Sequence, residues 1–180
     1  MGFTPLDGVP MTKRSGSVDP GLLLWLLDRG LTADELRDGL YTGSGLLGLS
    51  DGISADTRDL VASDDARAAF ALDVFAHRIR RELAAMATNF DHIDALVFTG
   101  EIGWDQPEVR EAICAGLGVL NVGGGLAGNR DSDGPISSAD AAVPVFVVKP
   151  REDIQLCRDA LRALPRRPGR RTSPLGHRAS

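Results

Sequence analysis

The segment 94–107 constrains the fold of this chain most strongly. Its apolar run at 95–98 is short enough to predict a β-strand that is buried on both faces. Two glycines within 99–103 then permit a tight backbone turn, and Asp105 is expected to cap a helix with Pro107 in its first turn. A strand, a turn and a helix start in this order bring backbone N–H groups and the positive end of the helix dipole to one place, which favours the binding of a nucleotide phosphate. A plain glycine turn between a strand and a helix remains the alternative.

Size and composition indicate a globular protein. The chain has 180 residues, of which 43% are hydrophobic, and its mean hydropathy is -0.06. The apolar run 21–27 is too short to span a bilayer, and the N-terminus lacks the pattern of a signal peptide, so we expect a cytoplasmic protein without membrane contact. Cys114 and Cys157 occupy apolar-periodic positions and are expected to be buried free thiols, with a redox or metal role as the alternative.

Charge is distributed unevenly along the chain. The net charge is -5, but the segment 165–180 carries five arginines and no acid, which leaves 15 basic and 25 acidic side chains in residues 1–164. An acidic body argues against a broad nucleic-acid surface. The composition of 165–180 predicts a disordered Arg/Pro-rich tail beside a single domain over 1–164. Contact of this tail with nucleic acid or acidic lipid is the alternative to a solvated tail.

Helix-start signals divide the first 60 residues into short helices. Asp19 and Pro20 predict the N-cap and first residue of a helix that ends near Asp28. Thr32 and Glu35 form a capping box that opens a second helix. Leucines at positions 22, 23, 26 and 27 are expected to form the core face of the first helix, and Ser54 is expected to cap a third helix containing residues 56–58.

Longer elements alternate after residue 63. Residues 63–88 carry one apolar stripe and predict the longest helix, residues 144–149 predict a second buried strand, and residues 151–164 predict a last helix with an acidic first turn. This alternation of strands and helices argues for an α/β architecture. The three glycines at 123–125 suggest a phosphate loop, but no Gly-Lys-Ser/Thr follows them, which excludes a Walker A loop.

Several segments occur together in a characteristic order and spacing. They are Met1-Gly-Phe-Thr-Pro-Leu-Asp-Gly8, Thr12-Lys-Arg-Ser-Gly-Ser-Val-Asp-Pro20, Ser44-Gly-Leu-Leu-Gly-Leu-Ser50 with Ser54-Ala-Asp-Thr-Arg-Asp59, Val97-Phe-Thr-Gly-Glu-Ile-Gly103, and Arg151-Glu152. Through them residues 1–164 resemble the acetate kinase family. The resemblance implies the α/β, ribonuclease H-like fold of the actin-like ATPases (sugar kinases, Hsp70 and actin). It covers only the C-terminal, nucleotide-binding half of that fold, without its first strands.

The resemblance also implies roles for single residues. Arg14 matches the catalytic arginine that binds the carboxylate and the phosphoryl group in transit, a task that suits a planar guanidinium. Glu152 matches a glutamate associated with Mg²⁺, a hard cation that prefers oxygen ligands. The alternative for Arg14 is a loop arginine in a surface ion pair, and the alternative for Glu152 is a first-turn helix acid.

The positions that match nucleotide-binding residues are Asp56, Thr57, Arg58, Gly100, Glu101, Ile102, Gly103 and Asp105. For Asp56 and Arg58, the alternative is a helix-capping acid with a solvated arginine.

The chain departs from the family pattern in this nucleotide loop. Glu101 replaces a glycine, Trp104 replaces an acid and Asp105 replaces an amide. Glu101 places a carboxylate where a phosphate should approach bare backbone, which is electrostatically unfavourable. Thr57 replaces a larger apolar residue and thins the packing against adenine. We therefore expect weak binding of ATP or ADP.

The family reaction converts ATP and acetate to ADP and acetyl phosphate with Mg²⁺. In the family an N-terminal domain supplies an asparagine-containing phosphate loop, a catalytic aspartate, a second arginine and a histidine, none of which the resemblance places in this chain. Because phosphoryl transfer in this fold depends on positioning across a closed cleft, we expect an inactive acetate kinase fragment that needs its N-terminal half. The alternative is a non-catalytic remnant that binds nucleotide weakly or forms a homodimer through this domain. The choice of acetate or another short-chain carboxylate stays open.

Overall fold

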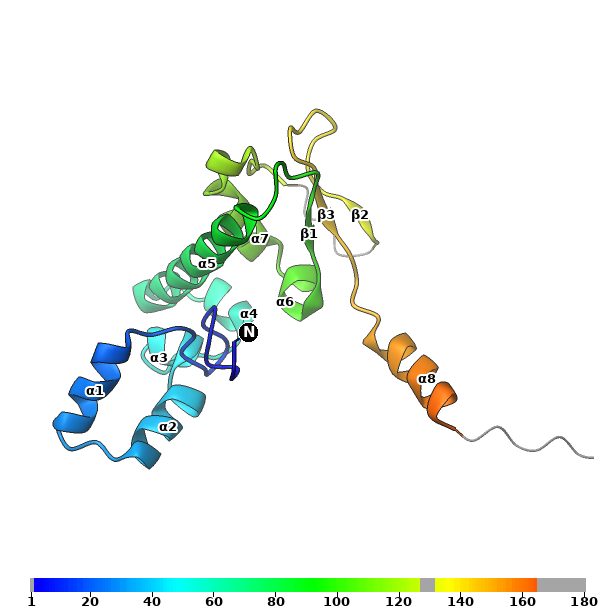
Figure 1. The fold of residues 1–180 in the computed structure, drawn as a ribbon. Helices are drawn as coiled ribbons and strands as arrows, with labels where there is room; N and C mark the ends of the chain where they lie inside the picture. The colour runs from blue at the N-terminus through cyan, green and yellow to red at the C-terminus, as the bar shows by residue number, and fades with distance from the viewer. Residues whose placement is uncertain (1, 127–131, 165–180) are drawn as a thin grey trace, which may run out of the picture. The chain divides into compact units, whose positions relative to one another are not determined.

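The computed structural model describes residues 2–126 and 132–164 (Figure 1). These residues belong to two compact units. Unit 1 extends from Met1 to Pro150, and unit 2 begins at Arg151. The described part of unit 2 consists mainly of one helix, α8 (Glu152–Ala163). The predicted disordered tail, 165–180, lies outside the described residues. Among the described residues, no helix is both long and apolar enough to cross a membrane.

Four short helices follow one another in the first part of unit 1. They are α1 (Pro20–Asp28), α2 (Ala33–Thr42), α3 (Gly45–Leu49) and α4 (Thr57–Val61). The Asp19 carboxylate accepts a hydrogen bond from the backbone N–H of Gly21 at 2.7 Å. The capping box of α2 is also present, because Glu35 accepts from the Thr32 backbone N–H at 2.8 Å. Both predicted helix starts are confirmed.

The predicted core face of α1 is wrong. No residue of this helix is buried, and Leu22, which belongs to the predicted face, is 48% exposed. Leu23 and Leu26 are only half-buried, since α1 packs mainly against its neighbour α2 and not on the main core. The apolar periodicity identified the helix correctly but could not show which surface would cover it.

The core of unit 1 surrounds the long helix α5 (Ala66–Ala87), which packs against α3, α4 and α7 (Pro107–Ala115). Asp65 is the N-cap of this helix, which lies within the range 63–88 predicted from the sequence. The fully or almost fully buried apolar side chains of the core include Leu46, Leu60, Ala68, Ala71, Phe75, Val109, Ile113, Cys114, Leu117, Val145 and Val147.

A small sheet completes unit 1, with the strand order β1-β3-β2. Strand β1 (Leu96–Phe98) pairs in parallel with β3 (Val145–Val147), and β2 (Gly134–Pro135) pairs with β3 in the antiparallel sense. The prediction that β1 is buried on both faces is wrong, because Val97 is 52% exposed. Alternate side chains of a strand point to opposite faces, and only the face of Leu96 and Phe98 packs against the core.

The predicted glycine turn after β1 forms a helix instead. The segment folds as α6 (Gly100–Asp105), which Gly100 opens with a φ of +76°. Asp105 is therefore the last residue of α6 and not an N-cap. Gln106 is the N-cap of α7, because Pro107 restricts the residue before it to an extended conformation and then starts the new helix itself.

The two cysteines have different environments. Cys114 is fully buried in the core, as expected, whereas Cys157 on α8 is exposed, so the prediction for Cys157 is wrong.

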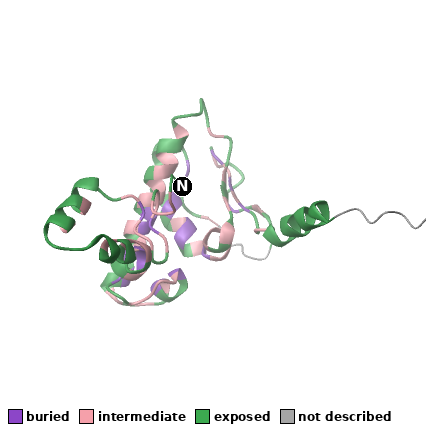
Figure 2. Cartoon of the chain, turned by 60° about the horizontal axis from the view of Figure 1, so that its bottom comes forward, coloured by how far each residue is buried: buried purple, intermediate pink, exposed green. Residues whose placement is uncertain are grey.

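Helix α8 has the predicted acidic first turn, but every residue in it is exposed, as the green helix beside the grey trace in Figure 2 shows. Its apolar stripe therefore has no covering surface within unit 2 as far as the structure describes that unit.

Candidate functional site

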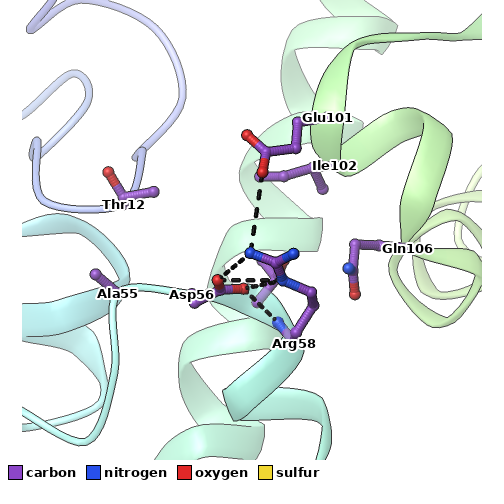
Figure 3. Close-up of a pocket in the computed structure, with 8 residues that line it drawn as sticks. Thr12, Ala55, Asp56, Arg58, Glu101, Ile102 and Gln106 are labelled. Atoms are coloured by element: carbon purple, nitrogen blue, oxygen red, sulfur yellow. Dashed lines mark hydrogen bonds and ion pairs between the residues drawn. The ribbon is translucent and has the colours of Figure 1, made fainter. Parts of the chain in front are cut away.

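Three segments of unit 1 meet at a pocket with a volume of about 280 Å³ (Figure 3). They are the loop at Thr12, the start of α4, and α6 with the residue that follows it. The residues that line the pocket are Thr12, Ala55, Asp56, Thr57, Arg58, Glu101, Ile102 and Gln106. Five of these belong to the nucleotide-binding set predicted from the sequence, so the pocket brings together two motifs that are far apart in the chain.

The loop that carries Thr12 is fixed by backbone pairing with the start of α3. The N–H of Leu46 donates to the carbonyl of Met11 at 2.9 Å, and the N–H of Leu47 donates to the carbonyl of Thr12 at 3.0 Å. Gly45 has a φ of +62° and lies so close to the Met11 and Arg14 backbone that a Cβ would clash there. The Gly-Leu-Leu sequence therefore holds Thr12 at the rim of the pocket.

Arg14 does not line the pocket, although Thr12 in the same loop does. The Arg14 side chain is half-buried, and its Nη1 lies 3.7 Å from the sulfur of Met11. Its backbone carbonyl accepts from the N–H of Met11 at 3.0 Å, which closes the loop. The predicted catalytic arginine is therefore two positions along the chain from the lining residue Thr12 and does not itself line the pocket.

Asp56 and Arg58 form a tight pair at the start of α4. Asp56 is the N-cap and accepts from the Arg58 backbone N–H at 2.9 Å, while Nη2 of Arg58 donates to Oδ2 of Asp56 at 2.5 Å. These bonds lower the pKa of Asp56 to about 2, and the Asp56 carboxylate in turn raises the pKa of Arg58. The prediction that Ser54 caps this helix is wrong, because its hydroxyl oxygen instead accepts from the N–H of Asp56 at 3.0 Å.

The same Asp-x-Arg arrangement occurs at the start of α5. Asp65 accepts from the Arg67 backbone N–H at 2.8 Å and from Arg67 Nη2 at 2.8 Å. These contacts likewise lower the pKa of Asp65 to about 2. Because neither residue lines the pocket, the pairing itself is a way of starting a helix, and Asp56 does act as a helix-capping acid. Arg58 differs from Arg67 in that it lines the pocket.

Helix α6 brings a second carboxylate toward Arg58. Oε1 of Glu101 lies 3.9 Å from Nη2 of Arg58, and the Glu101 side chain is 84% exposed. Gly100, Gly103 and Asp105 do not line the pocket. Gly103 lies against Phe98, and the charge of Asp105 contributes to the raised pKa of Arg58.

Sequence reasoning missed the residues that support α6. Gln106 is almost fully buried and lines the pocket. Arg110, which is only 1% exposed, donates from Nη1 to the carbonyls of Gly103 at 2.9 Å and Trp104 at 2.7 Å. An arginine within an amphipathic helix usually faces solvent, so no sequence pattern indicated that Arg110 would be buried and would hold α6.

Two backbone N–H groups at the end of the glycine run 123–125 are paired with a carboxylate of the chain. The N–H groups of Gly125 and Leu126 donate to the carboxylate of Glu111 at 2.6 and 2.8 Å. The Glu111 carboxylate therefore occupies two of the donors that a phosphate loop in this segment would use.

Glu152, the predicted metal ligand, is exposed at the start of α8 in unit 2. Within residues 2–126 and 132–164, no group of three or more His, Cys, Asp or Glu side chains could hold a metal ion. Mg²⁺ commonly uses one or two carboxylates together with substrate phosphates. The donor set thus fits an ion held mainly by a nucleotide and does not fit a cage made by protein alone.

Comparison with known proteins identifies the relatives of this chain. The model of the acetokinase family matches residues 1–158. This chain belongs to the acetokinase family. An acetate kinase from Rhodopseudomonas palustris is 44% identical to it over 169 residues, which are 90% of this chain and 41% of that protein.

Solved structures of the family have the same fold. The chain matches an acetate kinase from Porphyromonas gingivalis with a TM-score of 0.79 and 31% identity, over 90% of this chain and 42% of that one. It matches a propionate kinase from Francisella tularensis with a TM-score of 0.78 and 31% identity, over 88% and 42% of the two chains. The predicted actin-like α/β fold is thereby confirmed. The acetokinase chain described here spans about two fifths of the length of these relatives.

Proposed function

We propose that this chain is the nucleotide-binding part of an acetate kinase. Its pocket takes the adenosine portion of ATP or ADP, between Thr12, the Asp56–Arg58 pair and α6. The observation that carries the proposal is the convergence of two family-matching motifs, 54–59 and 97–103, on one pocket. A volume of about 280 Å³ is close to the lower limit for small-molecule sites.

In the proposed reaction, an acetate oxygen forms a bond to the γ-phosphorus of ATP, and the bond from that phosphorus to the β,γ-bridging oxygen breaks. The products are acetyl phosphate and ADP. Arg14 would stabilise the charge on the phosphoryl oxygens in transit, as a planar guanidinium can. Mg²⁺, when bound, neutralises phosphate charge, and Glu152 is the residue proposed to contact it. A cytoplasmic location is part of the same proposal.

Catalysis requires a complementary part of the enzyme. Positioning and charge neutralisation across a closed cleft supply most of the rate in phosphoryl transfer, so we expect no turnover by this chain alone. A hydroxamate assay with ATP, Mg²⁺ and acetate tests this directly. Adding the N-terminal part of the Rhodopseudomonas palustris relative should produce acetyl phosphate, and Arg14→Ala should abolish that activity. Turnover by the isolated chain would contradict the proposal.

Self-association is a second candidate function, and the exposed face of α1 favours it. Leu22, Leu24 and Trp25 are all about half exposed or more, and apolar surface of this kind often marks a protein contact. We expect sedimentation velocity to detect a dimer that Leu24→Glu weakens at least tenfold. A chain that remains monomeric at millimolar concentration would exclude this function.

A further inference from the structure

The charges that line the pocket do not suit a phosphate. Asp56 and Glu101 are negative and Arg58 is positive, and the other lining residues are uncharged. The guanidinium of Arg58 therefore lies between two carboxylates, as Figure 3 shows, at 2.5 Å from Asp56 Oδ2 and 3.9 Å from Glu101 Oε1. Its positive charge is already compensated, and the lining as a whole is negative.

The uncharged lining is better suited to a nucleoside. Thr12, Thr57 and Gln106 offer hydroxyl and amide groups that can pair with a base or a ribose, while Ile102 and Ala55 offer apolar contact. A phosphate that approached Arg58 would come close to the Glu101 carboxylate. Repulsion between like charges at such distances disfavours that approach.

We infer that Glu101 makes this pocket select the uncharged nucleoside and disfavour the phosphate-bearing form of the same ligand. This inference rests on the proposed function, since it assumes that the pocket binds an adenine nucleotide. Glu101 is a specificity-determining residue in this account. Its side chain extends from α6 into solvent beside Arg58, so its removal changes the charge of the pocket without opening the core.

The Arg67 pair provides an internal comparison. Arg67 also lies between two carboxylates, at 2.8 Å from Asp65 Oδ2 and 3.0 Å from Asp51 Oδ2. The second carboxylate of Arg67 is therefore nearer than the second carboxylate of Arg58. The looser Glu101 contact can be released without disturbing the cap of α4, which depends on Asp56 alone.

Isothermal titration calorimetry with adenosine and with ADP, in the absence of divalent cations, tests the inference on the full chain. Removal of one negative charge by Glu101→Gln should tighten ADP binding about fivefold and change adenosine binding less than twofold. The gain for ADP should shrink between low and physiological salt, because exposed charges are screened. Asp73→Asn removes a charge from an exposed site on α5 that does not line the pocket, and it should leave both affinities unchanged.

Any one of the following calorimetric results would contradict the inference. If Glu101→Gln leaves ADP binding unchanged, or tightens adenosine binding equally, the inference is wrong while the proposed function stands. If Asp73→Asn has the same effect as Glu101→Gln, the effect comes from net charge and the inference is also wrong. If the unmodified chain binds neither adenosine nor ADP at millimolar concentration, the proposed function fails and the inference fails with it.

Discussion

At the scale of single residues, the two Asp-x-Arg pairs separate a structural role from a binding role. Both pairs start a helix with nearly the same hydrogen bonds, but only Arg58 lines the pocket. We therefore expect Arg58→Ala to weaken ADP binding about tenfold, because it leaves the Asp56 and Glu101 carboxylates of the pocket without their compensating positive charge. Arg67→Ala, the matched control, should weaken it less than twofold. Equal effects of the two variants in calorimetry would show that Arg58 acts only through the helix start.

The Asp56 carboxyl should titrate far below its ordinary pKa of 3.8. Arg58 holds the pKa of Asp56 at about 2 in the folded chain. Since the folded value is the lower one, the pair contributes stability above about pH 4, and this contribution is lost as the pH falls toward 2. Carbon-13 NMR should show a midpoint near 2 for Asp56, and Arg58→Ala should bring it back toward 3.8. An unchanged midpoint in the variant would contradict the assignment of Arg58 as the cause.

The two thiols should differ in reactivity. Burial raises the pKa of Cys114 to about 11, whereas Cys157 is exposed. At pH 8 we expect one thiol per chain to react rapidly with Ellman's reagent and the second to react only on unfolding. Cys157→Ser should remove the rapid phase. A rapid phase that survives this substitution would show that Cys114 is accessible.

At the scale of elements, local signals predicted the starts of α1 and α2 correctly, missed the N-caps of α4 and α7, and did not show how the elements pack. The Thr32–Glu35 box and the Asp19 cap depend on residues within three positions, so the sequence predicted them correctly. The same reasoning failed at Gly100, where a positive φ starts a helix immediately and leaves no turn. It also failed for α1, because periodicity reveals a stripe but not the surface that covers it.

The placement of α6 depends on Arg110, which no sequence pattern indicated. Arg110→Met should lower the free energy of unfolding by about 2–4 kcal/mol, since it leaves two carbonyls of α6 without this buried donor. Arg80→Met is a suitable control, because Arg80 Nη1 also donates to a carbonyl, that of Ala112 at 3.3 Å, but Arg80 is less buried. It should cost less than about 1 kcal/mol in denaturant unfolding. Similar losses of unfolding free energy for both variants would contradict the role of Arg110 in holding α6.

At the scale of the whole molecule, the chain has the fold of its relatives over two fifths of their length. The sequence motifs were sufficient to predict the fold and to indicate which segments share a pocket. They could not predict Thr12 and Gln106 as lining residues, because these positions depend on how three separate segments meet. The relation of Arg14 and Glu152 to a bound nucleotide stays a prediction.

A nitrogen-15 NMR titration with ADP tests the central claim most directly, since it reports each backbone amide of the chain. Our account predicts shifts that saturate at millimolar ADP and cluster at Thr12, at residues 55–58 and at residues 101–106. Shifts confined to other surfaces, or none at millimolar ADP, would contradict the claim that this chain carries the nucleotide pocket of an acetate kinase.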